Sequence, residues 1–250
     1  MNKFGNEERA AKAKEHIKEM ELLYHGDIKK SINESIIYNS KLDLDKDKKT
    51  ENIIIENLDT VSAIFKHADN KTAVLNFASF YNPGGGYIWG TMAQEEALCS
   101  ESTLYNVLSA EKFKDYYSVN WNNFNDYLFY DKGIYSSNIL FERNNEIKNV
   151  SVITVAAPNR RKQEKATKEE NYEALKSRIE FIINIAKKNN IETLILGEFG
   201  CGVFSQDPKE VAELFKKELE NKYFNKVIYA IMPDKENLNF KIFNEVNNSN

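Results

Sequence analysis

The chain has 250 residues, a formal net charge of -4 and a sequence pI near 5.6. This acidic balance disfavours sequence-independent binding to duplex nucleic acid, which needs a basic face. No run of about 18 apolar residues occurs, and the N-terminus lacks the apolar segment of a signal peptide, so we expect a soluble, cytoplasmic protein without membrane contact. Cys99 and Cys201 do not have the spacing of a disulfide framework or a thiolate zinc site, and we expect both to be reduced.

The first third of the chain predicts a helix, a polar stretch and then a strand–helix–strand unit. Residues 6–24 show a helical apolar face, whereas residues 41–51 are polar and form a solvated turn. A calcium loop is excluded there because Lys48 replaces the required glycine and Ile54 replaces the bidentate glutamate. A short strand at 53–55, a helix capped at Asp59 and a buried strand at 73–77 follow.

A glycine-rich loop comes directly after this last strand. Gly84, Gly85 and Gly86 are followed, seven residues later, by Gln94, Glu95 and Glu96. Glycines let backbone N–H groups approach a diphosphate or ribose closely, and positive φ costs them little. Apolar residues recur at helical spacing from Ala97 onward, so both acids fall in the first turn of a helix.

The remainder alternates between strands and helices. An aromatic, asparagine-rich insertion at 113–130 is followed by strands near 139–141 and 151–156, an exposed basic loop at 160–168 and an amphipathic helix at 169–189. A strand at 193–196, a second glycine loop, a helix, a strand at 227–232 and a terminal helix complete the chain. This alternation predicts an α/β fold with a mostly parallel sheet covered on both faces.

The second glycine loop spans residues 197–204 and precedes a helix with Asp207 as its N-cap and Pro208 in its first turn. In open α/β sheets, ligands gather at the carboxyl ends of the strands, so both loops are expected to line one crevice. Neither loop matches the dinucleotide or phosphate-loop fingerprint, which argues against nucleotide-dependent redox chemistry and phosphoryl transfer.

The paired acids have two interpretations. First-turn carboxylates stabilise a helix through its dipole, and this alone explains many such residues. Adjacent helical residues point about 100° apart, so the two acids can instead line neighbouring parts of one ligand, one holding hydroxyls and the other transferring a proton. An acid that donates a proton near neutral pH needs a raised pKa, from burial or a nearby negative charge.

These motifs together resemble the microbial form of the poly(ADP-ribose) glycohydrolases, whose catalytic domain is a macrodomain. The resemblance extends over about 10–243 and is most specific in the Gln94-Glu95-Glu96 and Gly200-Cys201-Gly202-Val203-Phe204 runs. Further similar runs are Asn76-Phe77-Ala78-Ser79, Asn82 through Gly86, Ala97-Leu98-Cys99 and Ser102-Thr103-Leu104-Tyr105.

The resemblance implies hydrolysis of the ribose–ribose O-glycosidic bond of poly(ADP-ribose), from the chain end, with release of ADP-ribose. No metal or other cofactor is expected, because the three histidines lack metal-ligand spacing with any cysteine or acid cluster. Glu96 would act as general acid and then base, Glu95 would hold ribose hydroxyls, and Gln94 would support the loop. Gly84, Gly85 and Gly86 would shape the ribose site. The run from Gly200 through Cys201, Gly202 and Val203 would bind the diphosphate through its amides, while Phe204 would press on the terminal ribose.

The resemblance also implies a macrodomain-like three-layer α/β/α sandwich with an N-terminal helical extension. We expect one catalytic domain over 1–250, with the extension at 1–70 and a core at 71–246 that contains both loops. The expected partners are poly(ADP-ribose) or ADP-ribosylated macromolecules, with ADP-ribose as product and no sequence-specific nucleic-acid binding. The alternatives are a hydrolase that removes ADP-ribose from modified protein or nucleic-acid bases, and a non-catalytic ADP-ribose-binding module.

Several side chains stay open at this point. Asn82 either contacts the ribose or forms the turn before Pro83, and Asn159 either reaches the crevice or belongs to a loop. The cations Arg160, Arg161 and Lys162 either meet polymer phosphates or face solvent. Aromatic residues of the 113–130 insertion, such as Tyr117, Trp121 and Tyr127, pack in the core by default. A Cys201–histidine nucleophile is disfavoured because all histidines precede the motifs.

Overall fold

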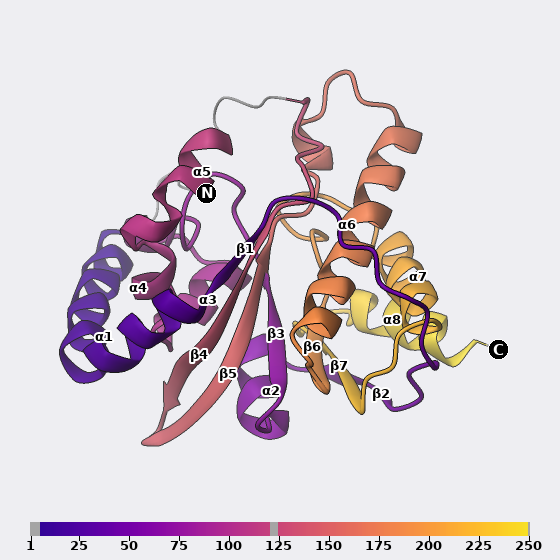
Figure 1. Ribbon diagram of the computed structural model, residues 1–250. Coiled ribbons are helices and arrows are strands. Elements are labelled where there is room, and N and C mark those ends of the chain that lie inside the picture. The colour runs from indigo at the N-terminus through magenta and orange to yellow at the C-terminus, as the bar shows by residue number, and fades with distance from the viewer. Residues whose placement is uncertain (1–5, 121–124, 250) are drawn as a thin grey trace.

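The computed structural model describes residues 6–120 and 125–249, so Trp121 lies outside the described residues (Figure 1). The helices are α1 (Glu7–Glu34), α2 (Thr60–His67), α3 (Gln94–Ser100), α4 (Leu104–Leu108), α5 (Lys114–Asn120), α6 (Lys168–Lys188), α7 (Pro208–Leu219) and α8 (Leu238–Asn248). Short 3-10 turns lie at Tyr87–Trp89, Glu111–Phe113 and Arg160–Lys162. The strands are β1 (Ile36–Tyr38), β2 (Ile53–Asn57), β3 (Thr72–Phe77), β4 (Gly133–Arg143), β5 (Glu146–Val155), β6 (Thr193–Gly197) and β7 (Lys226–Ile231).

The strands form one seven-stranded sheet in the order β1-β4-β5-β3-β6-β7-β2. The five strands from β5 to β2 run parallel to one another, and β4 pairs antiparallel with both β5 and β1. The predicted mostly parallel, mixed α/β sheet is therefore confirmed.

Helices cover both faces of the sheet, as Figure 1 shows, with α6, α7 and α8 on one side and α1, α3, α4 and α5 on the other. Side chains alternate between the two faces along each strand, so Leu75 packs in the core beneath α6 and α7 while Val74 packs in the opposite core. Both faces are buried, which explains why the central strands are almost continuously apolar.

Local signals placed most element starts correctly. Asp59 caps α2 by accepting from the Ser62 N–H, and Asp207 caps α7 with Pro208 in its first turn, as predicted. The N-terminal helix is longer than the predicted 6–24: it continues through a kink at Tyr24 to Glu34. The three-residue strand β1 was not predicted, because so short a segment carries no readable periodicity.

The parallel strands deliver their following loops to one edge of the sheet. Strand β3 lies between β5 and β6, so the loops that follow these three strands are direct neighbours. No helix within the described ranges is both long and apolar enough to cross a membrane.

Candidate active site

Both glycine loops meet at the carboxyl ends of β3 and β6, which pair in parallel. The first loop leads from β3 into α3, and the second leads from β6 into α7. The loop after β5, on the other side of β3, completes this edge. The expected convergence of the two loops on one region is confirmed.

The backbone of the first loop approaches both acids closely. Gly84 and Gly85 have φ of 63° and 60°, which is the left-handed region that glycine tolerates best. A Cβ on Gly85 would lie 2.6 Å from Glu96 Oε1 and 2.9 Å from Glu95 Oε2. The two carboxylates therefore flank one glycine, and a side chain there would displace them.

Gln94 joins the start of α3 to the end of β3. Its Oε1 accepts a hydrogen bond from the Phe77 N–H at 2.8 Å, and its Nε2 donates to the Leu75 carbonyl at 2.8 Å. These two bonds engage the end of β3 beyond Val74, where its pairing with β6 stops. They set the direction in which the first turn of α3, and thus Glu95 and Glu96, faces the loop.

Glu95 is buried and held through both of its oxygens. Its Oε1 accepts from Asn76 Nδ2 at 3.1 Å, and its Oε2 accepts from the Ser79 N–H at 2.7 Å. Burial raises the pKa of Glu95 to about 8, and the nearby Glu96 charge adds to this, although the Ser79 and Asn76 hydrogen bonds act in the opposite direction. A substantial fraction of Glu95 is therefore protonated near neutral pH.

Glu96 is also buried, but only one of its oxygens is held. Its Oε1 accepts from the Gly86 N–H at 2.7 Å. Its Oε2 is buried and, within the described part of the chain, has no hydrogen-bond partner. A buried carboxylate oxygen without a partner is costly, so this atom is the one that a bound hydroxyl or water would satisfy.

The second glycine loop presents backbone donors. Gly200 has φ of 77°, and nothing lies within 4 Å of a Cβ built on Gly202. Among the described residues, the N–H groups of Gly200, Gly202 and Val203 donate to no protein acceptor. The Cys201 N–H is already engaged, since it donates to the Glu198 carbonyl at 3.0 Å. Unengaged amides in such a loop suit an anion.

A buried amide network fixes this second loop, and sequence reasoning missed it. Gln206 Nε2 donates to the Pro158 carbonyl at 2.7 Å, and Gln206 Oε1 accepts from Asn171 Nδ2 at 2.9 Å. Asn171 Oδ1 also accepts from Gln163 Nε2 at 3.0 Å. The network joins the loops after β5 and β6 to α6, yet its members lie far apart in sequence and form no motif.

Phe204 closes the second loop against an aromatic cluster. Its ring lies 6.3 Å from that of Phe129, and Phe129 stacks on Phe80 at 4.2 Å. Phe129 has φ of 61°, an unusual conformation for a bulky residue, and its N–H and carbonyl are both bonded to the side chain of Asn125. Part of the predicted aromatic insertion thus supports the site and does not pack only in the core.

The side chains whose role the sequence left undecided lie in different environments. Asn82 is half-buried, and its carbonyl accepts from the Gly85 N–H at 3.1 Å, so it helps to form the turn. Asn159 is buried, and its Oδ1 has no partner among the described residues. Tyr117 is buried against Tyr116, whereas the half-buried Tyr127 lies beneath the Lys162 ammonium.

The cysteines are free and far from nucleophilic. Burial raises the pKa of both Cys99 and Cys201 well above the ordinary value. Each histidine contacts another polar side chain: His16 contacts the Tyr87 hydroxyl, His25 contacts Glu21 and His67 contacts Glu56. Within the described residues, no group of three or more His, Cys, Asp or Glu side chains could hold a metal ion.

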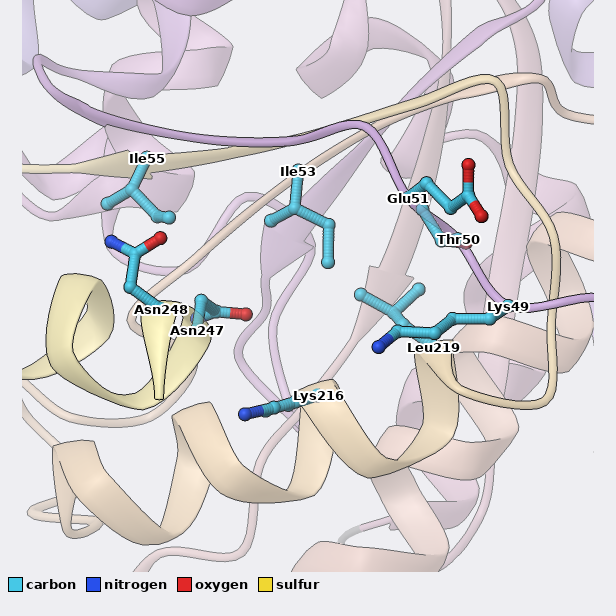
Figure 2. A pocket seen from close by; sticks show the side chains of 9 residues that line it. All are labelled: Lys49, Thr50, Glu51, Ile53, Ile55, Lys216, Leu219, Asn247 and Asn248. Atoms are coloured by element: carbon cyan, nitrogen blue, oxygen red, sulfur yellow. The ribbon is translucent and has the colours of Figure 1, made fainter. Parts of the chain in front are cut away.

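A separate pocket lies at the opposite edge of the sheet, where β2 begins. Its cavity is about 320 Å³ and is bounded by β2, the preceding residues 49–51, and the C-terminal ends of α7 and α8 (Figure 2). Figure 2 shows Ile53, Ile55 and Leu219 beside Asn247 and Lys216. Neither glycine loop lines it, so it is distinct from the candidate active site.

Comparison with known proteins gives one family. The model of the family "Microbial-type PARG, catalytic domain" matches residues 8–144, a range that contains the first loop and α3. The second loop lies outside this range but within the structural matches below. A comparison with curated protein sequences found no match.

Solved structures of bacterial poly(ADP-ribose) glycohydrolases are similar to this chain over most of its length. Poly(ADP-ribose) glycohydrolase (PARG) from Thermomonospora curvata has a TM-score of 0.82 and 26% identity, covering 96% of this chain and 100% of that one. The same enzyme bound to the inhibitor ADP-HPD has a TM-score of 0.82 and 26% identity, covering 96% and 99%. PARG from Deinococcus radiodurans in complex with ADP-ribose has a TM-score of 0.75 and 25% identity, covering 88% and 96%.

Proposed function

The chain belongs to the microbial-type PARG catalytic-domain family, and from this premise we propose that it is a poly(ADP-ribose) glycohydrolase. It hydrolyses the ribose–ribose O-glycosidic bond of the polymer and releases ADP-ribose. The structures of similar enzymes with ADP-ribose or an inhibitor bound support the same ligand here.

The observation that most supports this proposal is the difference between the two acids. Glu95 is held at both oxygens, whereas Glu96, among the described residues, is held only at Oε1 and presents a buried Oε2 without a partner. A general acid needs an oxygen that is free to face the leaving group. We therefore assign proton transfer to Glu96 and the positioning of ribose hydroxyls to Glu95.

The reaction proceeds in two proton transfers at Glu96. Glu96 gives a proton to the departing ribose oxygen as the glycosidic bond breaks, which leaves an oxocarbenium-like sugar. Glu96, now a carboxylate, removes a proton from water as the water oxygen bonds to the anomeric carbon. The negative charge of the bound diphosphate favours the cationic state, and one carboxylate thus serves both steps, unlike the opposed pair of many glycosidases.

The two loops bind the substrate from either side. The amides of Gly200, Gly202 and Val203 bind the diphosphate, and Phe204 presses on the terminal ribose. The first loop, from Asn82 through Gly84, Gly85 and Gly86, shapes the ribose site, and Gln94 holds α3 against β3. The unengaged amides of the second loop and the close approach of Gly85 to both acids support this division.

We further propose one macrodomain-type catalytic domain over 1–250, acting at the chain end. Residues 1–70 are the N-terminal extension and contribute α1, α2 and both edge strands, while the core at 71–246 contains both loops. The reaction needs no metal, because acid–base catalysis by Glu96 accounts for each step. The two free cysteines support a cytoplasmic location.

The test compares the wild type with Glu96→Gln for ADP-ribose release from poly(ADP-ribose) in the presence of a chelator. We expect release by the wild type and a rate about 10² to 10⁴ times lower in Glu96→Gln, since this is the usual contribution of a general acid–base. Binding of ADP-ribose, measured by calorimetry, is expected to survive the substitution.

Two outcomes favour the alternatives. A wild type that binds ADP-ribose but leaves polymer, modified protein and modified bases intact would be a binding module. Release of ADP-ribose from modified protein or nucleic-acid bases, with polymer left intact, would assign the chain to that class of hydrolase.

A further inference from the structure

The segment that connects β5 to α6 is strongly basic. This segment, residues 160–168, is called the basic strap here; its cations are Arg160, Arg161, Lys162, Lys165 and Lys168, and its anion is Glu164. Five positive charges less one negative charge give +4, in a chain whose net charge is -4. So dense a concentration against an acidic background creates a local field that attracts polyanions.

Most cations of the strap contribute little to the stability of the fold, although Arg160 lies 3.9 Å from Glu210 and Lys162 contacts the Tyr127 ring. Arg161, Lys162, Lys165 and Lys168 are exposed and, within the described ranges, have no ion-pair partner. Lys168 is the first residue of α6, where a cation is disfavoured by the helix dipole. These charges therefore call for an explanation outside the folded chain.

The backbone of the strap is held in a defined position. Asp126 accepts hydrogen bonds from three consecutive backbone N–H groups, those of Glu164 at 3.1 Å, Lys165 at 2.8 Å and Ala166 at 2.7 Å. A capping box at Thr167 then begins α6. The cations are thus presented from a fixed backbone, which lowers the entropy cost of binding a ligand.

The strap lies beside the candidate active site. The Arg161 N–H donates to the Phe204 carbonyl at 3.2 Å, and the Lys162 ammonium lies 5.3 Å from the centre of the Tyr127 ring. Figure 1 shows the connection from β5 to α6 rising above the edge of the sheet where the glycine loops lie. Phe204 thus contacts the strap on one side and belongs to the proposed diphosphate loop on the other.

We propose that the basic strap is a second phosphate subsite, which binds the diphosphates of the polymer beyond the scissile bond. This inference rests on the proposed function, because it requires a ribose between Phe204 and Glu96 and a polymer that continues past it. Each further unit of poly(ADP-ribose) carries a diphosphate, so the remaining chain is a polyanion. The exposed cations of the strap, next to Phe204, match that charge without selecting a base sequence.

The test is equilibrium binding of ADP-ribose and of long poly(ADP-ribose) to the inactive Glu96→Gln protein. The strap variant is Arg161→Gln/Lys165→Gln/Lys168→Gln, which leaves the backbone bonds to Phe204 and Asp126 in place. The matched control is Lys14→Gln/Lys29→Gln/Lys30→Gln, which removes the same charge from exposed positions of α1.

We expect the strap variant to bind long polymer about tenfold more weakly and to bind ADP-ribose with unchanged affinity. The magnitude of the slope of log polymer affinity against log salt concentration should fall by about 2. The control should show none of these changes. Equal losses in the strap variant and the control would overturn the proposal, because the effect would then reflect net charge alone.

Two further outcomes separate the proposals. Single-stranded DNA that binds more tightly than the polymer, with an affinity that the strap variant loses, would assign the surface to nucleic acid and overturn the subsite. Failure of the parent protein to bind ADP-ribose at all would refute the proposed function, whereas intact ADP-ribose binding with strap-independent polymer binding would refute only the subsite.

Discussion

Replacing Gly85 with alanine tests whether the close approach of the first loop to the acids sets the catalytic geometry. Gly85 has φ of 60°, which costs an alanine about 1–2 kcal/mol. The added Cβ would also lie 2.6 Å from Glu96 Oε1 and 2.9 Å from Glu95 Oε2. Both contacts are too short to persist, so the carboxylates have to move.

The backbone strain lowers mainly the stability of the protein, whereas the steric clash lowers mainly its activity. The clashing atoms are the ends of side chains, which can shift, so the free energy of unfolding should fall by little more than the backbone cost of about 1–2 kcal/mol. The shift, however, breaks the bond from the Gly86 N–H to Glu96 or the bond from the Ser79 N–H to Glu95. Misplacement of a catalytic group by about 1 Å can cost about 100-fold in rate, so activity should fall far more than stability.

The assay combines the initial rate of ADP-ribose release with denaturant unfolding. The control is Gly26→Ala, because nothing lies within 4 Å of a Cβ at Gly26 in α1, and alanine there should add about 0.5–1 kcal/mol of stability without changing the rate. A folded Gly85→Ala protein with a rate within a few-fold of the wild type would show that this glycine does not set the position of the acids.

Two more predictions concern Glu95 and the amide network. Because burial raises the pKa of Glu95 from 4.5 to about 8, folding favours the protonated form, so its contribution is complete below pH 4.5 and is lost as pH rises towards 8. Urea unfolding at a series of pH values should show the free energy of unfolding of the wild type falling relative to that of Glu95→Gln across this range, by at most about 1.4 kcal/mol per pH unit. If the free energies of unfolding of the two proteins instead change in parallel with pH, the raised pKa of Glu95 is contradicted. Asn171→Leu leaves Gln206 and Gln163 without their partner and should cost about 1–3 kcal/mol of stability. It should also weaken ADP-ribose binding in calorimetry, and unchanged affinity would mean that the network does not position the second loop.

The local features of this protein could be predicted because their causes lie within a few residues. Asp59 and Asp207 accept from N–H groups three or fewer positions ahead, so cap residues mark the starts of α2 and α7. The placement of Glu95 and Glu96 in the first turn of α3 followed from the helical spacing of the next apolar residues. The glycine loops, the α/β class and the family resemblance were likewise readable from short runs.

Other features depend on contacts between residues distant in sequence. Only the folded sheet places β3 between β5 and β6, and so brings three loops together. The pairing of Glu95 with Asn76 and Ser79, and of Glu96 with Gly86, decides which acid keeps a free oxygen within the described part of the chain, and no spacing rule predicts it.

The amide network and the basic strap also depend on contacts between residues distant in sequence. Gln206 and Asn171 are 35 positions apart, and Asp126 reaches the strap across about 40 residues, so neither link leaves a local signature. Backbone propensity and capping act over one or two helical turns, and sequence alone therefore determined the elements and the motifs. The distances and partners that distinguish the two acids, and that set a basic segment beside Phe204, were decided by tertiary packing.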